Sequence, residues 1–303
     1  MYGSRRRLQV APGRNQTGFK HTLKEHFVTN RSGVKLCLHK IEASDTCVGT
    51  VILAHGMFSN YRFFRGLASY LSTLNYDCWL MDFQGHGFST NPEQEPDLES
   101  MSLEDTESVL DFVHRTANVP IWWVGHSGGG LAVLMYLARH PHQQGKFSGI
   151  VTVASQASDA GLNYKFRIFF KACRVLLKFI PKVPGKALRL GPEDEFTRVL
   201  DQWLAWSISK RWLGNDEFDY LAHMSNIQLP ALVIAGAGDK YIAPVSGCKK
   251  LYDSLASTDK TFLLFSKEKG YSENYRHDRI ISSHNASVDV WPAISEWIGN
   301  RST

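Results

Sequence analysis

A serine stands between glycines in the run Gly125-His126-Ser127-Gly128-Gly129. The apolar stretch 121–125 before it is typical of a strand, and residues 128–140 after it are typical of a helix. This is the context of a nucleophile elbow, a sharp strand-to-helix turn that exposes the serine hydroxyl. The glycines fit so tight a turn because larger side chains would clash there. The pattern predicts Ser127 as the nucleophile of an acyl transfer; the alternative, a phosphate-binding turn, lacks the Lys-Ser/Thr of a P-loop.

A serine hydroxyl needs a base to take its proton, and the sequence offers 12 histidines for that role. His277 follows the last predicted strand and precedes the last predicted helix, in a loop that can reach back over Ser127. His284 lies seven residues later along the same loop and is the chief competitor. We therefore predict His277 as the base, with His284 as the alternative.

A carboxylate should hold the base in the correct tautomer, and in this kind of turn the chain order is serine, acid, histidine. Asp239 ends the apolar strand 231–239, at the carboxyl edge of the predicted sheet, where ligand sites gather. Asp159, just after the preceding strand, is the substitute. A loop-capping role is the alternative for Asp239 itself.

Two backbone N–H groups should stabilise the negative charge that develops on the substrate oxygen. Gly128, directly after the nucleophile, is one predicted donor. Met57, in the turn after strand 50–56, is the other, with Phe58 as the second choice. Four side chains are predicted to line the substrate pocket: Phe58, His126, Trp203 and Trp206. For the two tryptophans, core packing is the alternative.

These candidates need a scaffold that brings distant segments together. Residues 22–42 are predicted to form a β-hairpin. Apolar strands then alternate with helical stretches; the predicted strands are 50–56, 77–83, 121–125, 149–155, 231–239 and 261–265, and the last predicted helix is 288–298. Apolar strands alternating with helices predict a parallel sheet that is covered on both faces.

About 70 residues between two of these strands exceed a normal crossover and predict an inserted helical cap over 157–225. Its predicted helices are 162–180 and 193–213. Residues 161–190 carry eight Lys or Arg and no acid, which favours an amphipathic helix with a basic face, as on membrane surfaces. The alternatives are a basic face that attracts an anionic substrate such as an acyl-CoA or phospholipid head group, and a solvated face whose apolar side packs on the core.

Composition is that of a globular protein: 303 residues, 43% hydrophobic and 21% charged, which excludes disordered, collagen-like and coiled-coil classes. The net charge of +5 equals the charge of residues 1–20, which we predict to be a disordered basic tail. We expect no nucleic-acid partner. No secretory signal or membrane span is recognisable. Five scattered cysteines without CxxC spacing argue against disulfides and zinc and favour a cytoplasmic location.

Residues 25–300 resemble the α/β-hydrolase superfamily, on the motifs HGMF at 55–58, MDFQGHGFS at 81–89, GHSGG at 125–129 and GAGDKYIAP at 236–244. The series is similar to monoacylglycerol lipases and lysophospholipase-like esterases. The resemblance implies a mostly parallel sheet of about eight strands, with core segments 21–156 and 226–303. It implies the triad Ser127, Asp239 and His277, the donors Met57 and Gly128, and no cofactor or metal.

The expected activity is hydrolysis of carboxylic esters with an apolar acyl group through an acyl-enzyme. Thioesterase, lactonase and acyltransferase activities share the same triad and stay open as alternatives, as does a non-catalytic lipid-binding module. The expected partners are a small ester or lipid substrate and a weak membrane contact through the basic cap helix. We expect a monomer or a homodimer.

Overall fold

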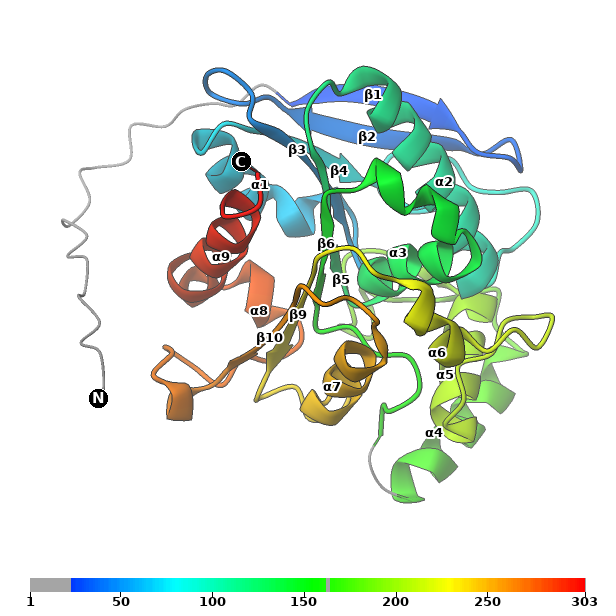
Figure 1. Ribbon diagram of the computed structural model, residues 1–303. Coiled ribbons are helices and arrows are strands. Elements are labelled where there is room, and N and C mark those ends of the chain that lie inside the picture. The colour runs from blue at the N-terminus through cyan, green and yellow to red at the C-terminus, as the bar shows by residue number, and fades with distance from the viewer. Residues whose placement is uncertain (1–22, 162–163, 303) are drawn as a thin grey trace.

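An eight-stranded sheet runs through the middle of the protein (Figure 1), in the order β1-β2-β4-β3-β5-β6-β9-β10. This computed structural model describes residues 23–161 and 164–302, so the predicted basic tail lies outside it. The strands are β1 (Lys24–Thr29), β2 (Lys35–Ile41), β3 (Gly49–Ala54), β4 (Tyr76–Met81), β5 (Ile121–His126), β6 (Gly149–Val153), β9 (Ala231–Gly236) and β10 (Lys260–Phe265). β2 is antiparallel to β1 and to β4, and all other neighbours are parallel. The predicted hairpin and mostly parallel sheet are confirmed.

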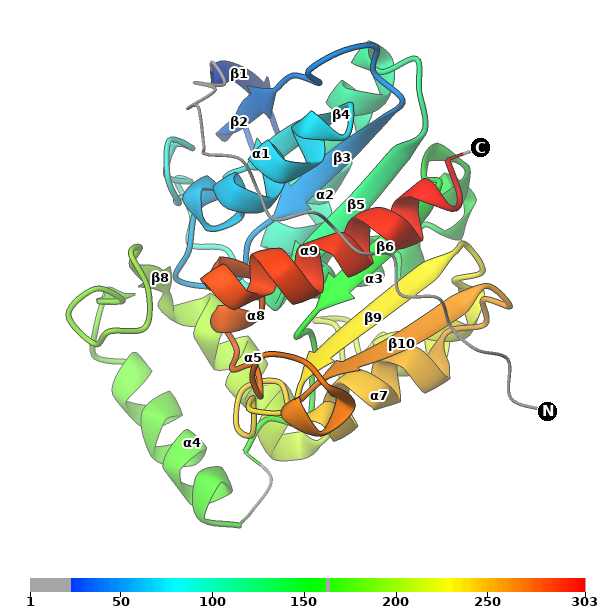
Figure 2. The same cartoon turned by 90° about the vertical axis from the view of Figure 1, so that its left-hand side faces the viewer.

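Helices cover both faces of the sheet (Figures 1 and 2). One face carries α1 (Arg65–Thr73) and α9 (His284–Gly299), with the short α8 (Arg279–Ser282) beside α9; the other carries α2 (Leu98–Thr116), α3 (Gly128–Arg139) and α7 (Val245–Ser254). Every residue of β3, β5, β6 and β9 is buried, as expected for central parallel strands that lie between two helical layers. The carboxyl ends of these strands therefore meet at one edge, where loops can assemble a site.

The segment between β6 and β9, predicted to be a cap and called the cap below, lies beside the sheet. Its elements are α4 (Tyr164–Leu177), β7 (Lys182–Val183), β8 (Glu195–Phe196), α5 (Thr197–Ser209) and α6 (Tyr220–His223). Both helices expected here are present. The first ends at Leu177 instead of residue 180, and the second begins at Thr197 because the residues before it pair as strand β8 with β7. In Figure 2, α4 stands at the outer edge of the molecule, and it packs on α5.

The outer cap helix has apolar residues on two sides. Phe170 and Leu177 are buried toward α5, with Phe166 and Cys173 partly buried beside them. The opposite side is also apolar, yet exposed; its residues and exposed fractions are Ile168 52%, Phe169 58%, Val175 55%, Leu176 64% and, beyond the helix, Phe179 79%. The alternative in which the apolar side of this helix packs on the core therefore describes Phe170 and Leu177 but not Phe169 and Leu176. The apolar residues span more of the helix circumference than one neighbouring helix can cover.

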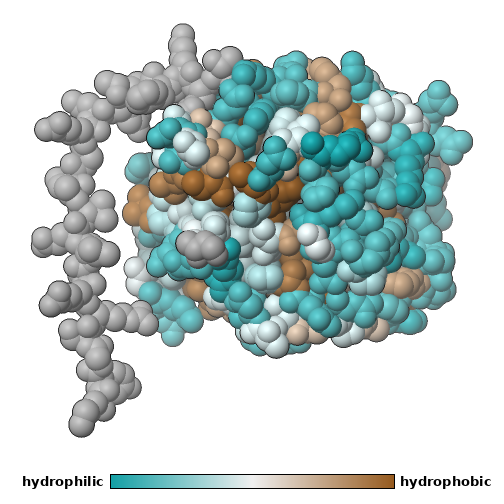
Figure 3. Space-filling model, turned by 45° about the horizontal axis from the view of Figure 1, so that its top comes forward, coloured by the Kyte–Doolittle hydropathy of each residue, from teal (hydrophilic) through white to brown (hydrophobic). Residues whose placement is uncertain are grey.

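The face that includes the β1–β2 side is largely hydrophilic, with one band of hydrophobic residues (Figure 3). Within the described residues, no helix is both long and apolar enough to cross a membrane. All five cysteines are free, as their scattered positions predicted.

Arg139 at the end of α3 ties the core to the cap side. Its guanidinium donates to Glu99 and Asp216, both at 2.6 Å, and to the Tyr220 hydroxyl, also at 2.6 Å. The Glu99 carboxylate is buried and accepts a further hydrogen bond from the N–H of Asn215. A buried carboxylate that loses its cation is strongly destabilising, so this pair holds α2, α3 and the 213–220 loop together.

We predict that Arg139→Ala lowers the free energy of unfolding by about 2–4 kcal/mol, because it leaves the Glu99 carboxylate buried without a cation. The matched control is Arg301→Ala, whose Asp259 partner is nearly half exposed, and it should cost less than about 1 kcal/mol. Urea unfolding followed by circular dichroism measures both. Equal losses in the two variants would contradict the role assigned to Arg139.

Candidate active site

Three predicted residues meet at the carboxyl edge of the sheet. Ser127 follows β5, Asp239 follows β9, and His277 lies between β10 and α8. The Ser127 Oγ lies 3.0 Å from His277 Nε2, and His277 Nδ1 lies 2.5 Å from an Asp239 oxygen. The alternatives are elsewhere: His284 is exposed at the start of α9, and Asp159 forms an ion pair with Lys250. The hydrogen-bonded series Asp239–His277–Ser127 has the geometry of a nucleophile, a base and an orienting acid.

The turn at Ser127 depends on close contact between backbones. Ser127 has a φ of 52°, in the left-handed region that non-glycine residues rarely adopt. A Cβ at Gly125 would lie 2.3 Å from the Gly129 oxygen, and one at Gly129 would lie 2.1 Å from the Ala54 oxygen. The glycines on either side of the serine therefore let β5, α3 and the end of β3 pack at backbone distance. The serine's N–H donates to Val153, which ties the turn to β6.

The buried Asp239 carboxylate is kept ionised by its neighbours. Burial by itself would raise the pKa of Asp239, but the hydrogen bond and charge of His277 and the N–H groups of Ile242 and Ala243 lower it below the ordinary value. An ionised Asp239 accepts the Nδ1–H of His277, which leaves Nε2 free to accept the serine proton. The carboxylate can then stabilise the imidazolium that forms.

The two predicted oxyanion donors lie side by side. A Cβ built on Gly128 would be 3.7 Å from the Met57 nitrogen. Gly128 is the first residue of α3, so its N–H is free of the helix, and neither N–H has a hydrogen-bond acceptor within the described part of the chain. The second-choice donor, Phe58, is engaged: its N–H donates to Glu195 Oε2 at 3.1 Å. The geometry thus favours Met57 over Phe58.

His55 fixes the direction of the Met57 N–H. Its Nδ1 donates to the Gly56 carbonyl at 2.7 Å, and its Nε2 accepts from the N–H of Phe83 at 3.2 Å. Burial lowers the pKa of His55 to about 4, so the ring is neutral and can play both roles. In a trans peptide the N–H points away from the carbonyl, so a fixed Gly56 carbonyl also fixes the Met57 N–H.

His126 lies against the base rather than in an open pocket. Its Nε2 donates to the His277 carbonyl at 2.8 Å, and the two rings are 4.7 Å apart. Burial, with the neighbouring His277, lowers the pKa of His126 to about 3, so the ring is neutral. This contact braces the loop that carries His277.

The other predicted pocket residues are packed inside the structure. The ring centroids of Trp203 and Phe170 of α4 are 6.0 Å apart, and Trp206 donates its indole N–H to the Leu213 carbonyl at 2.7 Å. Phe58 is buried beneath the cap. Their contact with a substrate stays a prediction.

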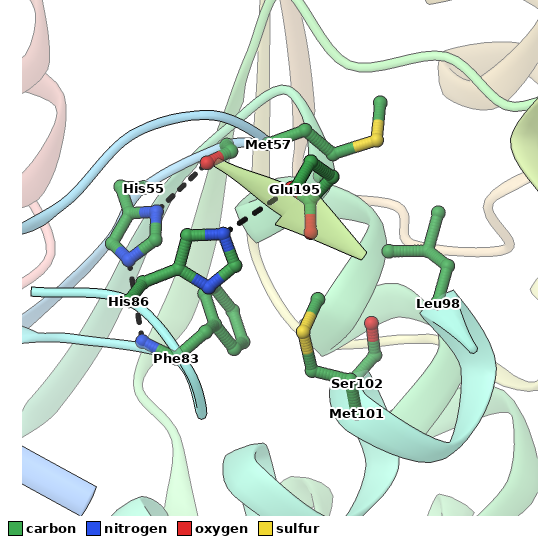
Figure 4. A pocket seen from close by; sticks show the side chains of 10 residues that line it. His55, Met57, Phe83, His86, Leu98, Met101, Ser102 and Glu195 are labelled. Atoms are coloured by element: carbon green, nitrogen blue, oxygen red, sulfur yellow. Dashed lines mark hydrogen bonds and ion pairs between the residues drawn. The ribbon is translucent and has the colours of Figure 1, made fainter. Parts of the chain in front are cut away.

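A small cavity of about 10 Å³ lies beside the oxyanion donors (Figure 4), room for about one water. Its walls include Met57, Gly128, Leu98 and a buried pair that sequence reasoning missed, His86 and Glu195. His86 Nε2 lies 3.3 Å from Glu195 Oε2, and both side chains are fully buried. The pair joins the Gly85-His86-Gly87 turn to the cap. No local pattern pairs residues 109 positions apart, although the glycines around His86 and the acidic run 193–195 before Phe196 are visible signals.

The chain matches the protein family described as serine aminopeptidase, S33, over residues 46–205, just over half of its length. It belongs to this family of α/β-hydrolases. Among solved structures, the fold is similar to a soluble variant of monoglyceride lipase from Saccharomyces cerevisiae in complex with a substrate analog (TM-score 0.72, 18% identity, 97% of this chain and 100% of that chain). It is also similar to monoacylglycerol lipase from Paleococcus ferrophilus (TM-score 0.62, 18% identity, 87% and 99%). At these identities the likeness shows the fold alone.

Two curated proteins share part of the sequence. A probable alcohol acetyltransferase from Cyberlindnera fabianii is 26% identical over 153 residues, 50% of this chain and 40% of that protein. The uncharacterized protein YfhR from Escherichia coli (strain K12) is 26% identical over 123 residues, 37% and 42%. The matches span about two fifths of these relatives.

One group in the described part of this α/β-hydrolase has metal-ligand atoms close together: Cys37, His39 and Asp82, within 4.8 Å and buried. The Asp82 oxygens already accept from His39 Nε2 at 3.0 Å and from the N–H groups of Tyr61 and Phe88. Burial, with nearby Asp82, raises the pKa of Cys37 to about 12, which opposes the thiolate that a metal needs. The cluster is a hydrogen-bonded core that anchors the turn after β4.

We predict that Asp239→Asn changes the dependence of stability on pH. Because the folded-state pKa of Asp239 is depressed, its contribution is present above the unfolded value of about 3.9 and is lost as pH falls through the folded value. The loss between pH 4 and pH 3 should therefore be smaller in the variant. Urea unfolding at pH 3, 4, 5 and 7 measures it, and identical pH profiles would contradict an ionised Asp239.

Proposed function

We propose that this α/β-hydrolase cleaves carboxylic esters through an acyl-enzyme on Ser127. The observation that carries the proposal is the geometry around His277, whose two nitrogens contact the Ser127 hydroxyl at 3.0 Å and the Asp239 carboxylate at 2.5 Å. Esterases and lipases among the similar folds support the same reaction class.

In the proposed reaction, Ser127 Oγ attacks the ester carbonyl while His277 Nε2 takes the serine proton. The carbonyl oxygen, now negative, is held by the N–H groups of Met57 and Gly128. His277 then protonates the leaving alcohol, which leaves the acyl group on Ser127. A water that gives its proton to His277 attacks the acyl carbon, releases the acid and restores the serine.

The substrate we propose has an apolar acyl group of medium or long chain. The cavity beside the donors holds about 10 Å³, so such a group needs displacement of the surrounding side chains, among them Met57 and Leu98. The neighbouring cap is rich in apolar side chains that a displaced segment can offer to the acyl chain. Substrate entry is therefore coupled to movement at the cap side of the site.

We predict that Ser127→Ala abolishes both ester hydrolysis and covalent labelling by a fluorophosphonate, because the labelled oxygen is removed. His277→Ala should lower kcat by at least about 10³-fold with Ser127 still present. Hydrolysis rates are measured with p-nitrophenyl esters of two to sixteen carbons, a thioester and a lactone. Mass spectrometry of the labelled peptide identifies the labelled residue. The control is His284→Ala, which should retain activity; labelling of Ser127→Ala would overturn the proposal.

Acyl transfer to an alcohol is a second candidate, favoured by the partial match to a probable alcohol acetyltransferase. The chemistry differs only in the last step, in which an alcohol replaces water as the group that attacks the acyl-enzyme. Hydrolysis assays repeated with added ethanol or glycerol distinguish the two reactions. Faster formation of a new ester than of the free acid favours acyl transfer.

We further propose that the cap docks reversibly on an anionic membrane surface and that the protein is cytoplasmic and membrane-peripheral. The exposed apolar side of α4 and Phe179, defined above, shares its segment with Lys165, Lys171 and Lys178, all exposed. An apolar surface next to lysines is suited to insertion among acyl chains with contact to anionic head groups. Five free cysteines are consistent with a reducing compartment.

The first turn of α4 lies next to the loop that follows Asp239. Phe166, in the first turn of α4, has its ring 5.0 Å from that of Tyr241, two residues after Asp239. The N–H of Gly161 also donates to the Tyr241 carbonyl. A lipid taken up at α4 would therefore enter beside the triad.

We predict that the double variant Phe169→Ser with Leu176→Ser loses most of its binding to vesicles that contain phosphatidylserine. The matched control replaces two exposed apolar residues elsewhere, Leu74→Ser with Val288→Ser, and should bind as the wild type does. Vesicle sedimentation at 50 and 300 mM salt measures both, and binding should weaken with salt because the lysines contribute. Equal binding by the two double variants would contradict the proposal.

A further inference from the structure

The loop that carries the Met57 N–H is held by three successive peptide groups. The Gly56 carbonyl accepts from His55, as described above. The next peptide donates its Phe58 N–H to Glu195 Oε2 at 3.1 Å, and the peptide after that accepts, through the Phe58 carbonyl, from the N–H of Glu193 at 3.1 Å. Two of the three contacts come from the cap, from residues 193–195.

Phe58 needs this support because its backbone is unusual. Its φ is 60°, in the left-handed region, although it is not a glycine. Such a conformation persists when surrounding contacts determine it. Those contacts here are the two hydrogen bonds from the cap, so the shape of the loop after Met57 depends on the cap being in place.

Glycines let the cap backbone come this close. A Cβ at Gly191 would lie 2.1 Å from the Phe58 carbonyl oxygen, and one at Gly185 would lie 2.8 Å from the Phe58 ring. Asn60, further along the loop, donates to the Glu193 carboxylate at 2.5 Å. The 185–195 segment thus contacts the loop after β3 at several points between residues 58 and 60.

The Glu195 carboxylate is fully buried, and its charge is accounted for. Its two oxygens accept from the N–H groups of Phe58 and Phe196, and His86 lies 3.3 Å away. Burial would raise the pKa of Glu195, but His86 and these N–H groups lower it, so the group is an anion. On the facing turn, a Cβ at Gly85 would lie 2.3 Å from the Phe196 ring, which explains the glycine before His86. Movement of this part of the cap away from the core would separate the buried His86–Glu195 pair, which is energetically costly.

We propose that Glu195 is a positioning residue of the oxyanion hole, which holds the Phe58 peptide, and through it the Met57 N–H, from the cap. The inference rests on the proposed function in taking Met57 as a donor. On this view the cap has two parts. The segment 183–196, called the root, stays attached to the loop after β3, and the outer helix, α4, packs on α5. Access to the site would then come from movement of α4, with the root in place.

The test compares Glu195→Ala with Glu195→Gln. The alanine variant loses the acceptor for the Phe58 N–H and should lower kcat by about 10²-fold, close to the effect of losing an oxyanion donor, with KM changed less than about twofold. The glutamine variant keeps an amide oxygen for the same N–H and should recover part of kcat. The control is Glu99→Gln, another buried carboxylate, whose partners are Arg139 and Tyr220; it should lower the melting temperature and leave kcat unchanged.

Gly191→Ala tests the same contact without touching a charge, in case Glu195→Ala does not fold. The added Cβ pushes the cap away from the Phe58 carbonyl and should also lower kcat, whereas Gly145→Ala, with nothing within 4 Å, should not. The rate of fluorophosphonate labelling of Ser127 is a second readout that needs no ester substrate. A wild type that is labelled but hydrolyses no ester refutes the proposed function alone; unchanged kcat and labelling rates in folded Glu195→Ala or Gly191→Ala refute the positioning role.

Discussion

At Ser127 the chain turns from β5 into α3 with a φ of 52°, while glycines on both sides bring three backbone segments into contact. This close approach sets the positions of everything else in the site. It puts Gly128 at the free N-terminus of α3 and Gly56 against the serine, where a Cβ would lie 2.8 Å from that of Ser127. The loop after β3, which carries Met57, thereby reaches Ser127.

Around this turn the site is built from neutral and ionised groups in a definite pattern. His55 and His126 are buried, have lowered pKa values and serve as neutral hydrogen-bonding groups. Asp239 and Glu195 are buried with lowered pKa values and serve as anions. Each anion faces one histidine, His277 or His86, and backbone N–H groups. The two buried carboxylates thus have parallel surroundings, one at the base and one behind the oxyanion loop.

The cap has two parts with different physical character. The segment 183–196 is joined to the core by backbone hydrogen bonds, glycine contacts and a buried ion pair. The helix α4 rests on α5 with one apolar side and presents the other to solvent. Exposed apolar residues on that scale are typical of surfaces that meet a partner or a lipid. Attachment at one end and apolar exposure at the other suit the proposed docking on a membrane.

The fold class and the alternation of strands and helices could be predicted from sequence, and so could the meeting of Ser127, Asp239 and His277. Local order carries that information: apolar strand, glycine-flanked serine and helix follow one another along the chain, and parallel strands end at one edge. The exposed side of α4 and the pairing of His86 with Glu195 could not be predicted in the same way. Helical spacing shows where apolar residues lie on a helix but not which side finds a neighbour. Contact between residues 58, 86 and 195 arises when the cap closes on the core. Residue types and their order along the chain thus set the chemistry that the proposed site could perform, whereas the folded contacts between cap and core set which buried charges hold its loops in place.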